Sequence, residues 1–421
     1  MVGMHSPAVG RRGPSVGFLR LVLGQGAFEL GGVFWWLSLP LIAVEILGAN
    51  EESVSALIAV CTWGGLLASG AIGWLADRRG HRFIYAGSVP LRVLGAAALV
   101  ALMASGGLTF SLLLTLALVL SISEVAFSIG QVGIVADLCS EDELASRNGA
   151  LRAAESGAQV GGSALGGLML ASWGAVVGPI VDGACALLSG LTLAGLRGIG
   201  KPSRSPSQNV RGVGVRTLLA VPALRSILVA QVFVTLASGI SLAVEASFVL
   251  VTLESGAGVL GAVYALGSVG ALVGALSAGR VMAQFGFVAP LRLGIAIGLP
   301  FSCLLPLATT GWGGLLVGVG NLGVSAGLGV FSVLQLTLRQ TVVERALLGR
   351  VTGVYRTVSG VVAALGTGMG AAAVGFIGAR SVLWVAAIVF SGAVVIVGRK
   401  AFARSIALAT EPTSPASAGC V

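Results

Sequence analysis

The chain has 421 residues, of which 56% are hydrophobic and only 10% charged, and its formal net charge is +9. With a mean hydropathy of +1.00, it has too few charged side chains to cover a soluble globule, which leaves the polytopic membrane class. The positive charge does not indicate nucleic-acid binding, because the cations fall in short loops without an aromatic stacking pattern. The five cysteines are scattered, with no CxxC and no metal-ligand spacing, so neither a metal site nor a disulfide framework is expected.

Twelve apolar stretches of helix length follow one another along the chain. Each can cross about 30 Å of hydrocarbon at a rise of about 1.5 Å per residue. We therefore predict an all-α polytopic membrane protein with twelve transmembrane helices, over residues 15–46, 52–76, 83–106, 108–136, 146–172, 174–198, 217–252, 255–279, 287–310, 312–338, 348–376 and 378–399.

The loops between these stretches differ in charge. Both chain ends and the loops after even-numbered stretches are basic, whereas Arg380 is the only one of the 25 Lys and Arg residues in an odd-numbered loop. Loops rich in Lys and Arg stay on the cytoplasmic side of a membrane. The sequence therefore predicts a multi-pass protein of the cell (inner, cytoplasmic) membrane, with both termini and every even loop in the cytoplasm.

One long polar segment interrupts the apolar pattern, KPSRSPSQNVRGVGVR over 201–216, and it divides the chain into six helices and six helices. Arg147 and Ser156 in the first half match Arg350 and Ser359 in the second half at the same spacing, which indicates duplication. Parallel six-helix repeats are typical of alternating-access carriers that hold substrate between the halves. The predicted parts are a tail (1–14), a first bundle (15–199), a linker (200–216), a second bundle (217–402) and a tail (403–421).

The second stretch ends in the sequence GWLADRRGHR, over residues 73–82. It resembles the loop signature of the major facilitator superfamily, G-x-L-a-D-r-x-G-r-r, which implies that family's fold of two pseudo-symmetric six-helix bundles around a central cavity. We expect Gly73 to permit close helix contact and Gly80 to form a tight turn. Asp77 should accept from the N-terminus of a neighbouring helix or pair with Arg350. The residues expected to serve this conformational motif are Gly73, Asp77, Arg78, Gly80, Arg82 and Arg350.

Two further stretches narrow the resemblance. DLCSEDELASRNGAL over 137–151 and LGRVTGVYR over 348–356 resemble segments of the macrolide-efflux and enterobactin-exporter type carriers. In the fifth helix, GSALGG over 162–167 is similar to the antiporter signature G-P-x-x-G-G, with Ser163 at the proline position. The alternative interpretation of this glycine-rich spacing is helix packing alone. The resemblance implies export.

Polar residues recur at helical spacing inside the first, fourth, seventh and tenth predicted helices. Such stripes are costly against lipid, so they should face protein or water. The same four helices line the cavity in the superfamily that the chain resembles. The candidate cavity and substrate residues are Gln25, Trp36, Ser128, Gln131, Gln231, Thr235, Asn321, Ser325 and Gln335.

Four glutamates within the predicted spans, Glu29, Glu124, Glu155 and Glu245, are candidates for proton coupling. A charge at mid-membrane costs about 2.5–3.5 kcal/mol, and a carboxyl group removed from water can exchange a proton near neutral pH. Glu29 and Glu124 are the predicted proton-linked pair, since each lies on a polar stripe without an adjacent cation. The alternatives are that Glu155 only pairs with Arg152, one turn away, and that Glu245 is solvated near the outer end of its helix.

Two other charged residues have structural interpretations. Asp182 is expected to cap or pair within the first bundle, and Arg92 is expected to extend towards the inner membrane surface.

These features predict a secondary active transporter that exports an amphipathic small molecule, such as a drug or secondary metabolite, by alternating access. An importer, an uncoupled facilitator or a non-transporting receptor are the alternatives. The chain has no HExxH, no G-x-S-x-G with a partnering histidine and no phosphate-binding loop, so neither an enzyme nor an ATP-driven pump is expected. We expect a monomer that uses the proton gradient, needs no cofactor or metal, and has only the substrate and the lipid bilayer as partners.

Overall fold

The computed structural model describes residues 16–138, 141–194 and 213–410, and all regular structure within these ranges is helical. The first half comprises α1 (Val16–Leu41) with the π-helix η1 (Ile42–Ile46), α2 (Glu51–Arg79), α3 (His81–Ala104), α4 (Phe110–Leu138), α5 (Glu141–Trp173) and α6 (Val177–Ala194). The second half comprises α7 (Val213–Ala220), α8 (Pro222–Ser247) with the π-helix η2 (Phe248–Thr252), α9 (Ala257–Phe285), α10 (Val288–Leu307), α11 (Gly313–Val342), α12 (Arg345–Gly398) and α13 (Lys400–Thr410).

The predicted class, an all-α protein with twelve membrane-crossing helices in two bundles, is confirmed. Nine of the described helices are long and apolar enough to cross a membrane. One of them, α12, contains two of the predicted spans, which meet at Gly378 with a φ of +74°. The other two spans are α5, which carries more polar side chains, and α6, which is shorter.

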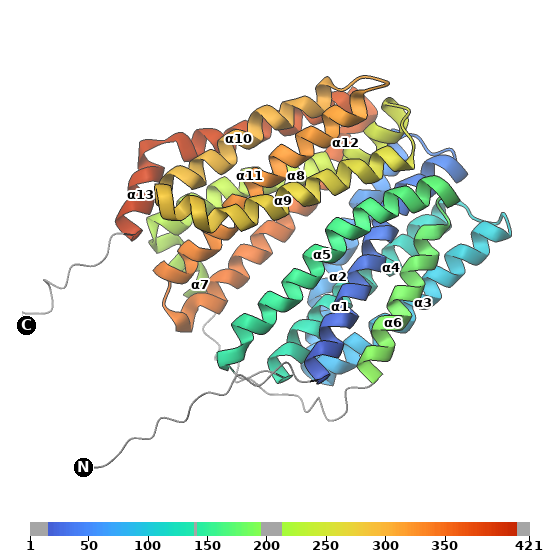
Figure 1. Cartoon of the computed structure of the whole chain (residues 1–421), viewed down its shortest axis with the longest axis horizontal. Helices are drawn as coiled ribbons and strands as arrows, with labels where there is room; N and C mark the ends of the chain where they lie inside the picture. Colours follow the sequence, from blue (N-terminus) through green and yellow to red (C-terminus); the bar gives the residue numbers. More distant parts are fainter. Residues whose placement is uncertain (1–15, 139–140, 195–212, 411–421) are drawn as a thin grey trace, which may run out of the picture.

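Figure 1 shows the two bundles side by side, and they pack tightly near one end only. We call the end with Arg79, Arg280 and Arg399 the basic side, and the other end the opposite side. Towards the opposite side, one apolar core joins residues of both bundles, such as Trp35 and Phe248. Towards the basic side, each bundle has an apolar core of its own, so the bundles diverge in that direction.

Close backbone and polar contacts hold the opposite side together. A Cβ added to Gly167 of α5 would lie 2.6 Å from the Cα of Gly261 in α9, so only glycine allows this approach. The carboxylate of Glu51, at the start of α2, accepts from the Thr252 hydroxyl and from the Ala379 backbone N–H, the latter at 3.2 Å. Both partners belong to the second bundle, so one carboxylate links it to the first at two points.

The first spanning helices of the two bundles end alike, since α1 runs into η1 and α8 runs into η2. This shared irregularity is what a duplicated six-helix unit would retain. The turn between α2 and α3 is made by Gly80, whose φ of +90° lies in a region that favours glycine, as the motif predicts.

Several boundaries differ from those predicted. The seventh span begins at Pro222 rather than at residue 217, because Val221 is extended and Pro222 starts a new helix. The short α7 precedes it from Val213, within the predicted linker, whose residues 200–212 lie outside the described ones. The helix α13 covers part of the predicted tail 403–421, and the tail 1–14 lies outside the described residues.

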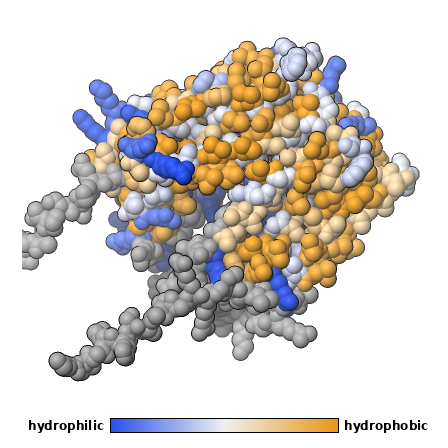
Figure 2. All heavy atoms as spheres, viewed as in Figure 1, coloured by the Kyte–Doolittle hydropathy of each residue, from blue (hydrophilic) through white to orange (hydrophobic). Residues whose placement is uncertain are grey.

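The surface agrees with membrane insertion. Figure 2 shows apolar side chains over both bundles on the face in view, with hydrophilic side chains gathered mainly near the ends. Trp74 (54% exposed) and Trp312 (85% exposed) lie near helix ends, where indoles anchor at a membrane interface.

Candidate transport cavities and charge cluster

A cavity of about 430 Å³, which we call the upper cavity, lies between the two bundles near the opposite side. Helices α1, α2 and α5 of the first bundle line it, as do α8, α9 and α11 of the second. Most of its lining is apolar. The lining residues are Val33, Trp36, Leu37, Pro40, Ile58, Gln159, Ser163, Leu242, Glu245, Ala246, Tyr264, Gly267, Ser268, Ala271, Asn321 and Ser325.

Glu245 is the charged group of the upper cavity. Its side chain is 7% exposed, and its Oε1 accepts a hydrogen bond of 2.6 Å from the Asn321 amide of α11. The alternative that Glu245 is solvated is therefore wrong. The chain continues past Glu245 into η2, whose residues belong to the apolar core that both bundles share, and this core covers the carboxylate. A smaller cavity of about 180 Å³ within the second bundle shares Glu245, Asn321 and Ser325.

A second cavity of about 430 Å³, which we call the lower cavity, lies nearer the basic side and is lined largely by polar residues. The Gln25 amide donates to Glu29 at 2.9 Å, and both face this cavity. Arg356 of α12 also lines it, so the lower cavity lies between the bundles. Its lining residues are Gln25, Glu29, Ser128, Gln131, Val132, Val135, Leu151, Glu155 and Arg356.

A smaller space of about 210 Å³ lies between α5, α9 and α11. It shares Gln159, Ser268 and Ala271 with the upper cavity and reaches Ser332 further along α11. Polar groups therefore continue from the upper cavity in the direction of the basic side.

Three of the predicted cavity residues do not line these spaces. Gln231 donates to the Thr235 hydroxyl at 2.7 Å, and Gln335 donates to Gln231 at 3.0 Å. These hydrogen bonds join α8 to α11 within the second bundle. They show that part of the polar stripe joins helices within the second bundle.

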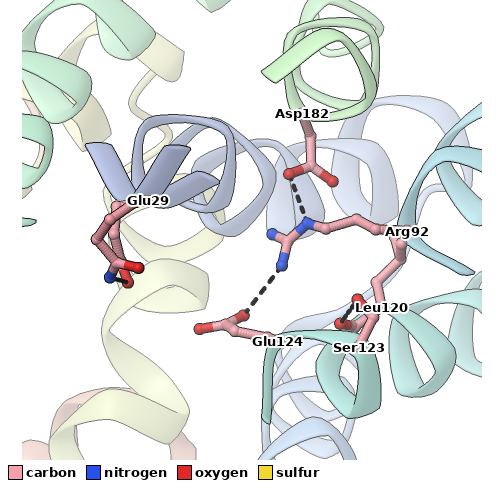
Figure 3. Close-up of polar contacts among 7 residues, drawn as sticks. Glu29, Arg92, Leu120, Ser123, Glu124 and Asp182 are labelled. Carbon is pink, nitrogen blue, oxygen red and sulfur yellow. Dashed lines mark hydrogen bonds and ion pairs between the residues drawn. The ribbon is translucent and has the colours of Figure 1, made fainter. Parts of the chain in front are cut away.

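A cluster of charged side chains is buried inside the first bundle, formed by Arg92 of α3, Glu124 of α4 and Asp182 of α6. The Arg92 Nε donates to Asp182 Oδ1 at 2.8 Å, and Arg92 Nη1 lies 3.9 Å from Glu124 Oε2. Figure 3 shows the guanidinium between the two carboxylates, while Glu29 lies to one side with its own hydrogen bond. The expected pairing of Asp182 within the first bundle is confirmed.

One expectation about this cluster is wrong. Arg92 does not extend to the membrane surface, because its side chain is 0% exposed and lies 4.4 Å from the centre of the Phe28 ring. Glu124 has no adjacent cation in the sequence, as expected, but Arg92 approaches it from another helix. Its side chain is 42% exposed, and the Trp36 indole of the upper cavity lies close to it.

The sequence makes room for this cluster with adjacent glycines on α1. A Cβ at Gly31 would lie 3.0 Å from Asp182 Oδ1, and one at Gly32 would lie 3.3 Å from Arg92 Nη2. Neither of the arginine's terminal nitrogens has a hydrogen-bond partner, nor does Asp182 Oδ2. The charges are thus paired but incompletely hydrogen-bonded, an arrangement that is costly for stability.

The loop motif lies at the basic side, where the bundles diverge. Asp77 and Arg350 are both exposed, and Asp77 has no hydrogen-bond or ion-pair partner among the described residues. A Cβ at Gly73 would meet nothing within 4 Å, so the expected close contact is absent in this conformation. Arg350 instead packs its backbone against α7, since its carbonyl oxygen is 2.9 Å from a Cβ placed on Gly214. The Arg78 guanidinium lies 4.0 Å from the centre of the Trp74 ring.

Some predicted features lie outside what the structure describes. The side chain of Arg152, the proposed partner of Glu155, is among them, as are most side chains of the exporter-like stretch 137–151.

Sequence and structure comparisons agree with this architecture. The model of the Major Facilitator Superfamily matches residues 21–367. The chain belongs to this superfamily. No curated protein matches the sequence. The chain is similar in fold to solved structures of transporters, and three of these are 15%, 12% and 16% identical to it in sequence.

The first of these is a bacterial metal transporter, with a TM-score of 0.66 over 92% of this chain and 98% of the other. The second is the nucleoside transporter NupG, with a TM-score of 0.71 over 92% and 98%. The third is a bacterial homologue of the iron transporter ferroportin in an inward-facing state, with a TM-score of 0.70 over 93% and 98%. At these identities the likeness concerns the fold alone, and it establishes neither substrate nor direction.

Proposed function

We propose that this superfamily member is a proton-coupled exporter of an amphipathic small molecule, in the macrolide-efflux and enterobactin-exporter type branch. The observation that carries this proposal is the placement of ionisable groups. A mostly apolar cavity between the bundles holds one carboxylate, and a neighbouring cluster contains two carboxylates that share one guanidinium. Buried ionisable groups are costly to retain in a membrane and mark ion or substrate pathways.

The cluster suits the binding of one proton. Asp182 is 1% exposed and hydrogen-bonded to Arg92, so this pair is neutral as a unit. An ionised Glu124 beside it leaves one excess negative charge inside the bundle, and a proton on Glu124 removes that charge. Because the Glu124 side chain is 42% exposed while the other two are almost inaccessible, Glu124 is the member that exchanges protons.

Trp36 connects this proton site to the substrate. It lines the upper cavity and lies close to Glu124. A molecule bound in the upper cavity would press on the indole and so change the surroundings of the carboxylate. Glu29 keeps its predicted role as a second proton carrier, now in the lower cavity on the route to the basic side.

The proposed direction of transport is outward, and the charge of the loops supports the side from which substrate enters. With the basic side in the cytoplasm, a molecule that enters between the diverging halves of the bundles comes from the cell interior. Closure of the basic side and opening of the opposite side would then release it outside, while protons enter. The arrangement matches alternating access around a fixed site between two repeats.

The test begins with a panel of chemically diverse growth inhibitors in a strain that expresses the chain and a strain that does not. A compound to which the chain confers resistance is then added outside proteoliposomes whose interior is more acidic than the medium. Wild-type protein should accumulate it uphill. Glu124→Gln should abolish accumulation while substrate exchange continues, since Gln keeps the shape but cannot titrate.

Glu29→Gln should behave like Glu124→Gln, and the exposed Glu45→Gln should behave like wild type. If both the position 29 and position 124 variants still concentrate the compound to the wild-type level, these glutamates do not couple transport. If no pH gradient drives accumulation by wild-type protein, the proton-coupled function itself is wrong.

A further inference from the structure

The upper cavity contains a carboxylate, Glu245, that is not part of the buried cluster of Arg92, Glu124 and Asp182. Glu245 is the only charged residue among the described residues that line either the upper cavity or the adjoining smaller one. The remaining polar groups are neutral, namely Gln159, Ser163, Tyr264, Ser268, Asn321 and Ser325 in the upper cavity. Whatever binds there meets a negative or neutral wall and never a positive one.

Glu245 also differs from Glu124 in its pairing. Within the described part of the chain, no Lys or Arg forms an ion pair with Glu245, and its hydrogen bond comes from the neutral Asn321 amide. A buried carboxylate of this kind is unfavourable unless a positive charge compensates it. A proton can supply that charge when the cavity is empty, and a bound cation can supply it when the cavity is filled.

The rest of the cavity indicates what kind of cation fits. Trp36 and Tyr264 present aromatic side chains, and most other lining residues are aliphatic, among them Val33, Leu37 and Ile58. Aromatic rings attract cations within about 6 Å of the ring centre, and more strongly where water is excluded. The volume of about 430 Å³ falls in the range of about 300–1,000 Å³ that is usual for drug-sized ligands.

We infer that the upper cavity selects organic monocations, with Glu245 as the residue that recognises the positive charge and Asn321 as the residue that orients it. The fitting substrate class is an apolar, preferably aromatic body that carries one protonated amine or quaternary ammonium group. This inference deepens the proposed export function by assigning the substrate's charge. It also assigns the two carboxylates different roles, since Glu245 in the second bundle binds the cation and Glu124 in the first bundle binds the proton.

Binding of two matched probes to the purified, detergent-solubilised chain tests the inference without any transport. Tetraphenylphosphonium and tetraphenylborate have almost the same shape and opposite charge. Wild-type protein should bind the phosphonium cation at least about tenfold more tightly than the borate anion, since hydrogen bonds and contacts to a charged group are worth about 1.5–3 kcal/mol.

Glu245→Gln should weaken phosphonium binding about tenfold or more. Its amide oxygen can still accept from Asn321, so the fold should be kept, which thermal unfolding and gel filtration would check. Glu45→Gln, an exposed glutamate at the same end of the molecule, is the matched control and should bind like wild type.

Equal phosphonium affinity of wild type and Glu245→Gln overturns the inference, as does equal or tighter binding of the borate. Failure of wild-type protein to bind the phosphonium at millimolar concentration overturns it too. These outcomes are separable from a failure of the proposed function. Cation binding that depends on Glu245, without uphill transport in a pH gradient, would refute proton-driven export and leave the charge selectivity standing.

Discussion

The buried charge cluster makes a quantitative prediction about Arg92→Gln. The Arg92 side chain is 0% exposed and its partner Asp182 is 1% exposed, so the substitution leaves a buried carboxylate without its cation. Removing one partner of a buried ion pair costs about 3–5 kcal/mol of unfolding free energy. The contact between the guanidinium and the Phe28 ring adds to this loss, by about 0.5–2 kcal/mol.

A double-mutant cycle separates the pair from general damage. In Arg92→Gln/Asp182→Asn both charges of the tighter pair are gone, so the double variant should be more stable than Arg92→Gln alone. We expect a coupling free energy of about 2–3 kcal/mol between the two positions. Denaturant titration of the protein in detergent micelles, followed by circular dichroism, measures the unfolding free energies.

The exposed Arg225→Gln serves as the control, and it should change stability by no more than about 0.5 kcal/mol. Two results would refute the reasoning. One is a loss for Arg92→Gln no larger than that of the control, and the other is a double variant that is less stable than both single variants.

Three further predictions concern the change between conformations. Glu51→Gln weakens the links between the bundles at the opposite side, so the rate at which a thiol reagent labels a cysteine introduced between the bundles there should rise about tenfold. An unchanged labelling rate would contradict this. Gly167→Ala places a methyl group 2.6 Å from Gly261, so spin labels across the opposite side should report longer distances, and unchanged distances would show that α5 and α9 adapt locally. Asp77→Asn should slow transport several-fold while equilibrium substrate binding stays near the wild-type value, and lost binding would exclude a purely conformational role.

Local sequence patterns are enough to predict most of the fold. Apolar length and loop charge anticipate the spans, and a glycine after two arginines anticipates the turn at Gly80. Helical spacing correctly indicates that Glu29, Gln131 and Asn321 face the interior, because a stripe on one face has only one direction that avoids lipid.

The charge cluster could not be predicted in this way. Arg92 and Asp182 are far apart in the sequence and lie on α3 and α6, and no periodicity within either helix relates them. A lone arginine within a span predicts a side chain that extends towards the membrane surface equally well. The available signal was indirect, namely Gly31 and Gly32 on α1, which leave space for two large polar side chains.

The residues of the loop motif at the basic side could be predicted only in part. Asp77 and Gly73 make no close contact here, as the bundles diverge at the basic side. We propose that Arg350 becomes available to Asp77 when that side closes. On this proposal the motif's turn is present in the observed conformation, and its side-chain pairing belongs to the closed one.

The two acidic sites differ in access within one conformation, and this difference bears on coupling. The Glu124 side chain is 42% exposed, while Glu245 is 7% exposed and lies beneath the joined opposite side. Opening the opposite side would separate the contacts at Glu51 and Gly167 and uncover Glu245 first. A cation held at Glu245 and a proton held at Glu124 would thus be released by different movements of the same bundles. Trp36 lines the upper cavity with Glu245 and lies close to Glu124, so a substitution there should uncouple the two sites without removing either carboxylate.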